Sequence, residues 1–358
     1  MKHDYLCSRL KLLPDIWSTD SKSVNLETFE SLKSFLSSCN KINLRDHSKT
    51  HPGQTPYQQS IFHFFLYYSY YPKVPFIIKT DHSLIIGSFY GRDYDSIELS
   101  KPIMSNALPA LNDIEYILYQ HDFGSFIRKE NISQILLRDS SEEMVQYMRS
   151  SPNRFSFNLS SLRELYYQIY DLNQTLGKRG KKFSNLRWHL NKFHRADHKI
   201  EVVYLSENVK PVIHLIGSWK KDAVKKRGFS YVNLRSDKLA ARLFGHSTKG
   251  SNYSSDEISF SDCLSRVLKV DGRIASFNFG YPLGFLQKEN VFAHAVGISD
   301  LSIPHLAEYA QYDFWNQIKQ HGYSFVNDGP SWRNSLELYK QKFRPVAKNR
   351  YYYATLKI

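Results

Sequence analysis

The chain has 358 residues, of which 42% are hydrophobic and 23% charged, so its composition is that of a globular protein with room for two domains. Its three cysteines, Cys7, Cys39 and Cys263, are widely separated, which excludes a disulfide scaffold and a C-x-x-C zinc or redox site. No window approaches the ~18 to 20 apolar residues that cross a bilayer, and the N-terminus lacks a signal-peptide core, so we expect a cytoplasmic protein.

The formal net charge is +14, and the excess of positive charge is concentrated in two stretches. Residues 177–228 carry a net charge of +10 and residues 338–358 a net charge of +6, so the remainder of the chain is nearly neutral. Concentrated charge costs self-repulsion that a merely soluble surface does not need. The pattern therefore favours a polyanionic partner, namely RNA, anionic lipid or a phosphorylated cofactor, over a solvated helical face.

The first half of the chain has the pattern of an α+β domain. A helix is expected over residues 26–36, and a β-hairpin is expected from the apolar and β-branched runs at 76–80 and 84–90. The elements expected next are a strand at 96–99, a helix at 111–120, a strand at 134–137, a helix at 140–148 and a strand at 154–158. Residues 1–158 are therefore predicted to form one domain.

A basic helical segment, residues 159–228, is expected to connect the two halves. Ser161-Leu162-Arg163-Glu164 has the pattern of a capping box, which predicts a helix that ends at Gly177. Two more helices are expected, a basic one over residues 181–195 and another over 208–227. The loop at 245–255 is rich in Gly, Ser, Asn and Tyr and is long enough to act as a lid.

The second half repeats the order of elements predicted for the first. Asp271-Gly272 is a strong hairpin signal. The elements expected around and after it are strands at 267–270, 273–279 and 291–298, a helix at 304–321, a strand at 323–326, a helix at 332–343 and a strand at 350–357. We predict a second α+β domain over residues 159–358, of related design to the first and including the basic helical segment.

Cations and aromatic residues are interleaved in residues 176–193. At helical spacing four apolar side chains fall on one face, which leaves the cations on another: Phe183, Leu186, Leu190 and Phe193. The candidates for phosphate contacts here are Lys178, Lys181, Lys182, Arg187 and Lys192. A routine surface helix explains the periodicity alone equally well.

A second basic cluster runs from the last predicted helix into the final strand. The helix dipole favours cations at a helix C-terminus whatever their function, which weakens a purely functional interpretation of Lys340 and Lys342. Arg344 and Arg350 lie outside this explanation and could hold phosphate or carboxylate through bidentate contacts. All four residues are candidates for binding donor phosphates.

The catalytic candidates lie at predicted strands. Asn327 and Asp328 follow one strand and precede a helix. Such residues are common in turns and N-caps, and we give this structural role about the same weight as a catalytic one. The functional alternative is that Asp328, with Asn327 beside it, orients or deprotonates an attacking amine. His294 is a third candidate, although a histidine on a strand is more often a core residue than a base.

Several functions are disfavoured by missing patterns. His189, His194 and His198 lack a set of carboxylate partners resembling a zinc site, so no metal is predicted. No G-x-S-x-G, Walker loop, G-x-G-x-x-G or H-E-x-x-H occurs in the sequence. Hydrolase, kinase and dehydrogenase activities are therefore disfavoured.

Three blocks of the sequence resemble the phosphatidylglycerol lysyltransferase C-terminal-domain family, whose members are built from two tandem GNAT (N-acetyltransferase-type) folds. The first is FSFNLSSLREL followed by LGKRGKKFSNLRWHLNKF, which resembles the family's strand, helix and Gly-Lys-rich segment. The second, VDGRIASFNFGYPLG, resembles its central hairpin. The third, YSFVNDGPSWRNSLELYKQKFRP with Arg350-Tyr351, resembles its terminal strand, Asn/Asp loop and helix. The blocks cover roughly residues 154–358, and the N-terminal half matches in architecture only.

The resemblance implies an α+β protein of two tandem GNAT-like domains that moves an amino acid from aminoacyl-tRNA to an amine or hydroxyl acceptor, which could be a small molecule, a peptide or a lipid. The donor would be the aminoacyl-tRNA itself, with no cofactor. Asp328 would handle the nucleophile, and the backbone of the strand at 291–296 would polarise the carbonyl. Peripheral contact with a membrane stays open.

Two alternatives stay open beside this interpretation. An acyl-CoA-dependent N-acyltransferase would hold the CoA phosphates with Asn327, Lys340 and Arg344. Such an enzyme needs a Gly-rich loop after its central strand for the pyrophosphate, whereas residues 297–310 contain Asp300 and Pro304 without G-x-G. The other alternative is a non-catalytic RNA-binding protein with a GNAT-like core.

Overall fold

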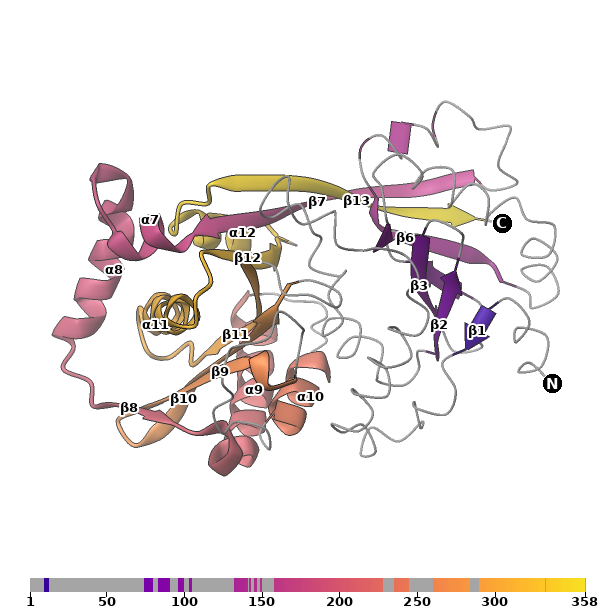
Figure 1. The fold of residues 1–358 in the computed structure, drawn as a ribbon. Helices are drawn as coiled ribbons and strands as arrows, with labels where there is room; N and C mark the ends of the chain where they lie inside the picture. Colours follow the sequence, from indigo (N-terminus) through magenta and orange to yellow (C-terminus); the bar gives the residue numbers. More distant parts are fainter. Residues whose placement is uncertain are drawn as a thin grey trace. The chain divides into compact units, whose positions relative to one another are not determined.

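The computed structural model describes residues 10–12, 74–79, 83–90, 96–99, 103–104, 132–140, 142, 145, 146, 149, 158–227, 235–244, 260–283, 290–331 and 333–357. The chain divides into two compact units (Figure 1). Unit 1 comprises Met1–Tyr166 and Arg350–Ile358, and unit 2 comprises Tyr167–Asn349. The helices predicted at 26–36 and 111–120, the loop at 245–255 and most of the strand at 154–158 lie outside the described residues. The predicted domain boundary stays a prediction.

Unit 1 is built on a run of paired strands with one parallel pair among those described. Its strands lie in the order β1 (Leu10–Leu12), β2 (Val74–Lys79), β3 (Ser83–Tyr90), β4 (Ser96–Leu99), β6 (Gln134–Ser140) and β13 (Ala347–Lys357), and β5 (Ile103–Met104) pairs with β3. The predicted hairpin is confirmed as the antiparallel pair β2–β3. β4 and β6 are parallel, with all four residues of β4 in register with residues 134–137. Helical residues follow β6 at Glu142, Val145, Gln146 and Arg149.

The helix predicted to begin at the capping-box pattern is wrong, because Ser161 lies inside a long strand, β7 (Asn158–Asp171). The run from Leu165 to Tyr170 is rich in aromatic and β-branched residues, which favour strands, and Leu165 and every residue from Tyr167 to Tyr170 are buried. The first helix of this region is α7 (Leu172–Gly177). Its N-cap is Asp171, whose Oδ1 accepts hydrogen bonds from the backbone N–H groups of Asn173 at 2.7 Å and Gln174 at 3.1 Å.

Unit 2 is built on its own run of paired strands, which also contains a single parallel pair among those described. The order is β7, β12 (Phe325–Pro330), β11 (Val291–Ser299), β10 (Arg273–Pro282), β9 (Leu264–Val270) and β8 (Ile200–Val203). The pair β11–β12 is parallel and the other pairs are antiparallel. The predicted Asp271-Gly272 hairpin is confirmed, and both of its turn residues have positive φ, 50° and 82°.

Helices cover both faces of the strands of unit 2 (Figure 1). One face carries α11 (Leu306–Gln320), on which α7 and α8 (Ser184–Arg195) pack; a 3-10 turn, η3 (Lys181–Phe183), precedes α8. The other face carries α9 (Leu205–Arg227) and α10 (Arg235–Phe244), and a 3-10 turn, η4 (Phe260–Asp262), precedes β9 in the chain. The last helix is α12 (Asn334–Gln341). Among the described helices none is long and apolar enough to cross a membrane.

The amphipathic pattern predicted for the basic helix is confirmed. The four apolar side chains of its stripe are at most 3% exposed: Phe183, Leu186, Leu190 and Phe193. Three of them join Trp315 in the core under α11, and Phe193 stacks on Tyr309 with ring centroids 4.5 Å apart. Burying a side chain of this size contributes about 1.5–3 kcal/mol, so the stripe fixes α8 on α11 and directs its cations to solvent.

Candidate functional site

The parallel strands β11 and β12 pair over only three residues and then part. The register runs from Val291–Phe325 to Ala293–Asn327 and stops there, although both strands continue. The next residue on each strand is His294 and Asp328, and the Nδ1 atom of His294 lies 3.1 Å from Oδ1 of Asp328. Two of the predicted catalytic candidates, 34 residues apart in sequence, thus meet where the pairing ends.

Backbone irregularities on both sides set the direction of these two side chains. The β10–β11 register shifts next to Gly280, which leaves Ala295 as an extra residue in β11 directly after His294. A Cβ at Gly280 would lie 2.2 Å from the carbonyl oxygen of Ala293, so this close approach requires glycine. The β12–β7 register shifts between Asn327 and Pro330. Bulges of this kind re-aim side chains next to active sites.

Asn327, the third catalytic candidate, is buried beside Asp328 but bonds the backbone. Its Oδ1 accepts a hydrogen bond of 3.0 Å from the backbone N–H of Gly329, whose φ is +65°. Asn327 therefore stabilises the irregular end of β12 and holds the position of Asp328.

Asp328 is a buried carboxylate with three neighbouring donors or cations. Its side chain is 9% exposed, Nζ of Lys340 lies 3.7 Å from its Oδ2, and Nε2 of Gln311 donates to the same oxygen at 3.4 Å. Burial raises the pKa of Asp328, but the charges of Lys340 and His294 and the hydrogen bonds outweigh burial and hold the pKa below its ordinary value. Asp328 is therefore ionised at neutral pH.

The hydrogen bonds around His294 fix the proton on one ring nitrogen. The Nδ2 amide of Asn278 donates to Oγ of Ser276 at 3.2 Å, which turns Oδ1 of Asn278 toward Nε2 of His294, 3.0 Å away. Nε2 must therefore carry a proton. Nδ1 accepts the indole N–H of Trp315 at 3.2 Å when the ring is neutral and donates to Asp328 when the ring is protonated. Nδ1 of His294 therefore bonds either the indole N–H or the carboxylate, and not both at once.

Lys340 lies in this cluster rather than on the basic surface. It is 4% exposed, and its Nζ donates to the backbone carbonyls of Asp328 and Gly329, the second at 2.9 Å. Burial lowers the pKa of Lys340, and the charge of Asp328 opposes that effect. A lysine so enclosed holds the end of β12 and balances the charge of Asp328, so we assign it to that role instead of to phosphate binding.

Five of the predicted phosphate-binding cations lie on the surface around α7 and α8, and we call them the basic surface: Lys178, Lys181, Lys182, Lys192 and Arg344. Nε of Arg344 donates to the carbonyl of Lys182 at 2.6 Å, which joins the C-terminal cluster to the start of α8. None of the five forms an ion pair with a carboxylate of the described residues. Exposed Trp188 lies among them, with Nζ of Lys192 5.9 Å from its ring centroid.

Three further predicted cations have carbonyl or carboxylate partners. Arg187 donates to the carbonyls of Lys178 at 2.5 Å and Gly180 at 2.8 Å, so it closes the turn before α8. Lys342 donates to Oε1 of Glu308 at 2.6 Å. Arg350 belongs to unit 1, where it pairs with Glu142 and lies 3.8 Å from Oε1 of Glu164.

The segment between β11 and α11 uses its own backbone donors. Oδ1 of Asp300 accepts the N–H of Ser302 at 2.8 Å, and the carbonyl of Asp300 accepts the N–H of Ile303 at 3.3 Å. The N–H of Leu306 is bonded to the carbonyl of Ile303. To hold a pyrophosphate at this helix N-terminus, these N–H groups would have to be free. Their engagement agrees with the absence of a G-x-G pattern in residues 297–310.

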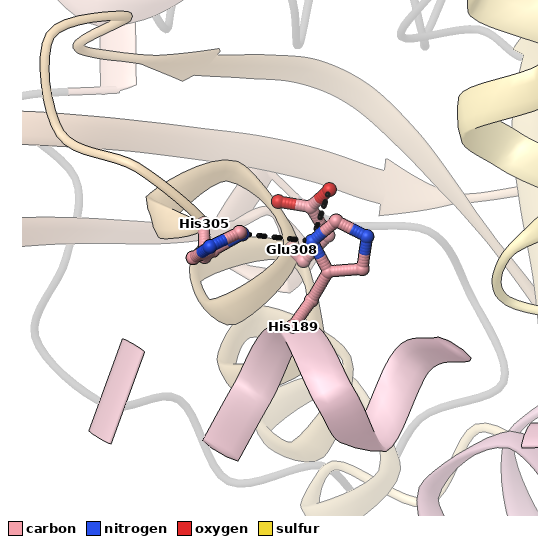
Figure 2. Close-up of side chains that lie close together, drawn as sticks. All are labelled: His189, His305 and Glu308. Atoms are coloured by element: carbon pink, nitrogen blue, oxygen red, sulfur yellow. Dashed lines mark hydrogen bonds and ion pairs between the residues drawn. The ribbon is translucent and has the colours of Figure 1, made fainter. Parts of the chain in front are cut away.

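Sequence reasoning missed the residues that support the candidates. Gln311 and Trp315 lie on one face of α11 and Asn278 on β10, and nothing in their local patterns marks them, because only the packing of α11 on the sheet brings them to His294 and Asp328. A second missed cluster joins His189 of α8 with His305 and Glu308 at the start of α11 (Figure 2).

Comparison with known proteins places the fold. Neither a family model nor a curated protein matches the sequence. A conserved protein of unknown function from Bacteroides thetaiotaomicron is similar in structure, with a TM-score of 0.59, 16% identity, and coverage of 84% of this chain and 91% of that one. L-PGS from Bacillus licheniformis is similar with a TM-score of 0.50, 16% identity, and coverage of 84% and 87%. The chain shares the mixed α/β fold of these two structures.

Proposed function

We propose that unit 2 carries the centre of an acyltransferase that moves an amino acid from aminoacyl-tRNA to an amine or hydroxyl acceptor. The observation that carries this proposal is the 3.1 Å contact between His294 and Asp328 at the point where β11 and β12 part. The fold similarity to L-PGS supports the general class of reaction, and the tandem GNAT-like arrangement belongs to the proposal as well.

The ester of the donor is already activated, so the protein needs to orient the reactants, polarise the carbonyl and accept a proton. Past Ala293, β11 has no partner on the β12 side among the described strands, so backbone N–H groups of this half of the strand can face the carbonyl oxygen. Asp328 accepts a hydrogen bond from the attacking amine or hydroxyl. The new bond joins that nucleophile to the acyl carbon, and the bond to the tRNA ribose oxygen breaks.

The His294–Asp328 pair receives the proton of the nucleophile. Because the pKa of Asp328 lies below its ordinary value, the carboxylate is a weak base by itself and serves best to orient the nucleophile. Nδ1 of His294, which faces the carboxylate, can store the proton until the ribose oxygen takes it. Trp315 and Asn278 are positioning residues for that ring.

The basic surface favours an RNA donor over acyl-CoA. Its cations are dispersed and unpaired with carboxylates of the described residues, which suits the backbone phosphates of an acceptor stem. The N–H groups of Ser302, Ile303 and Leu306 are already hydrogen-bonded within the segment, which disfavours a pyrophosphate site at the start of α11. The acyl-CoA-dependent alternative gains no support from this segment.

The reaction is tested by incubating the purified chain with a mixture of charged tRNAs and a cell extract as the source of acceptor. We expect selective loss of one aminoacyl-tRNA, and at least a 100-fold slower loss with Asp328→Asn, within the range for a lost proton-transfer partner. Asp197→Asn is the matched control, because Asp197 is exposed and its positive φ of 53° is tolerated by asparagine.

Two outcomes overturn the proposal. Turnover of acetyl-CoA by the same preparation, with charged tRNAs untouched, would replace it with the acyl-CoA alternative. Binding of tRNA without any deacylation, unaltered by Asp328→Asn, would indicate a non-catalytic RNA-binding protein.

The donor is tested separately through the salt dependence of tRNA binding. Removing two phosphate contacts lowers the slope of log K against log salt by about 1.4 to 1.8, so Lys181→Ala/Lys182→Ala should flatten it by that amount. Lys225→Ala, which changes an exposed lysine of α9, is the control and should leave the slope unchanged. Equal slopes for all three proteins would remove the basic surface from the tRNA interface.

A further inference from the structure

A second polar cluster lies between α8 and α11, apart from the His294–Asp328 pair. Nδ1 of His189 lies 2.8 Å from Nδ1 of His305 and 3.3 Å from Oε1 of Glu308. Figure 2 shows the three side chains converging, one from α8 and two from the start of α11. Their ligand atoms all lie within 4.8 Å of one another.

Two backbone and packing features hold this arrangement. His305 takes the N-cap position of α11 with a φ of +64°, which is uncommon for a residue other than glycine, and its side chain makes no capping bond. Its ring is directed to His189 instead. Trp188 packs edge-on against both imidazoles, with centroid distances of 4.9 and 5.1 Å, and forms an aromatic wall beside them.

Two imidazole Nδ1 atoms at 2.8 Å can share only one proton, because a second proton between them would clash. At least one ring nitrogen therefore presents a lone pair to the other and to Glu308. The same three atoms can bind a cation in place of the shared proton.

We propose that His189, His305 and Glu308 bind one divalent transition-metal ion, which ties α8 to the start of α11. Two histidines and one carboxylate form a ligand set found in zinc and non-haem iron sites. Zinc bonds of ~2.0 to 2.1 Å in tetrahedral geometry place ligand atoms roughly 3.3 Å apart. The His189–Glu308 distance already meets this value, and the two imidazoles have to separate by about 0.5 Å.

Lys342 is the built-in competitor of the ion. Its Nζ lies 2.6 Å from Oε1 of Glu308, so an ammonium neutralises the carboxylate in the absence of a metal. The side chain of Lys342 is 23% exposed and can swing to solvent when the ion enters, or the ion can take Oε2. Because Lys192 of the basic surface lies on α8 and Lys181 and Lys182 lie in the 3-10 turn directly before it, the ion would fix the helix next to those cations.

The test is metal binding by the full chain, freed of any polyhistidine tag and treated with chelator. We expect one equivalent of Zn²⁺ by titration calorimetry, a higher unfolding temperature with Zn²⁺, and a tetrahedral Co²⁺ absorption spectrum. His189→Ala and Glu308→Gln should each weaken Zn²⁺ binding at least ~100-fold, more than the 10- to 100-fold cost of losing an outer-shell partner.

His194→Ala is the matched control, because it removes an exposed histidine of the same helix that lies outside the cluster. It should bind Zn²⁺ like the unaltered chain. Absence of stoichiometric Zn²⁺ binding by the unaltered chain overturns the proposal whether or not the variants fold. So does equal affinity of the Glu308→Gln variant, whose side chain keeps the shape of glutamate.

Discussion

Units 1 and 2 have the same sequence of strand pairings but different side chains where the parallel pair ends. Unit 1 runs β2-β3-β4-β6-β13 and unit 2 runs β9-β10-β11-β12-β7, and in each the third and fourth strands are parallel while the others are antiparallel. In unit 1, Glu98 of β4 forms a buried ion pair with Arg138, just past the last paired residue of β6. In unit 2 the corresponding region holds His294 and Asp328.

The two pairs of side chains differ in whether they can exchange a proton, although the strand order around them is the same. Arg138 also donates to the hydroxyl of Tyr353 at 3.2 Å and stacks over that ring, so its charge is enclosed by partners of its own unit. A guanidinium cannot give up its proton in a protein, whereas a His–Asp pair can gain and lose one. We infer that the repeated pairing supports the fold in both units and that proton handling belongs to unit 2.

The largest effect is expected on the transfer rate, when a carboxylate is replaced by its amide in unit 2 and, for comparison, in unit 1. Asp328→Asn should slow aminoacyl transfer by a factor of about 10² to 10⁴. Glu98→Gln should cost about 1–3 kcal/mol of stability, because it weakens a charged hydrogen bond to Arg138 inside unit 1. Its transfer rate per folded molecule, measured with the charged-tRNA assay and corrected for the folded fraction, should stay unchanged. A matching loss of rate in Glu98→Gln would place part of the chemistry in unit 1.

The second effect concerns the stability of unit 2. Lys340→Met removes the buried ammonium and leaves the carboxylate of Asp328 without its cation, which should cost about 3–5 kcal/mol in urea unfolding. Lys348→Met is the matched control, because that lysine is 42% exposed and its pair with Glu337 should be worth about 0–1 kcal/mol. The double variant Lys340→Met/Asp328→Asn should recover part of the loss, since no buried charge is then left alone. Equal costs for the two single lysine variants would show that Lys340 does not balance Asp328.

Local patterns predicted the strands and helices of unit 2 better than its site. The Asp271-Gly272 turn and the apolar stripe of α8 are encoded by neighbouring residues, so the hairpin and the buried face follow from them. The strand β7 was missed because a capping-box pattern at Ser161 occurs inside a run whose aromatic and β-branched residues favour a sheet.

The site is predictable only in part, because its contacts join residues that are distant in sequence. Asp328 and His294 could be predicted, because each has a reactive side chain and lies at a predicted strand. The burial of Lys340 could not be predicted, because a lysine at a helix C-terminus has the pattern of a solvated cation. Only the fold brings β12 next to it. The contact of His189 with His305 joins residues 116 apart in sequence, and only the docking of α8 on α11 creates it.

The smallest effect is the acid dependence of the Asp328 contribution to stability. The folded-state pKa of Asp328 is lowered, so its ionised form stabilises unit 2 at any pH above the unfolded value of ~3.9. The difference in unfolding free energy between the unaltered chain and Asp328→Asn should be constant from pH 5 to 8. It should then shrink as the pH falls below about 4, at no more than ~1.4 kcal/mol per pH unit, because folding no longer benefits once the carboxylate is protonated. Urea unfolding at a series of pH values measures this difference. A decline that begins above pH 5 would mean that burial outweighs Lys340 and His294 and that the pKa of Asp328 is raised, in which case Asp328 would be a stronger base than the orienting role assumes.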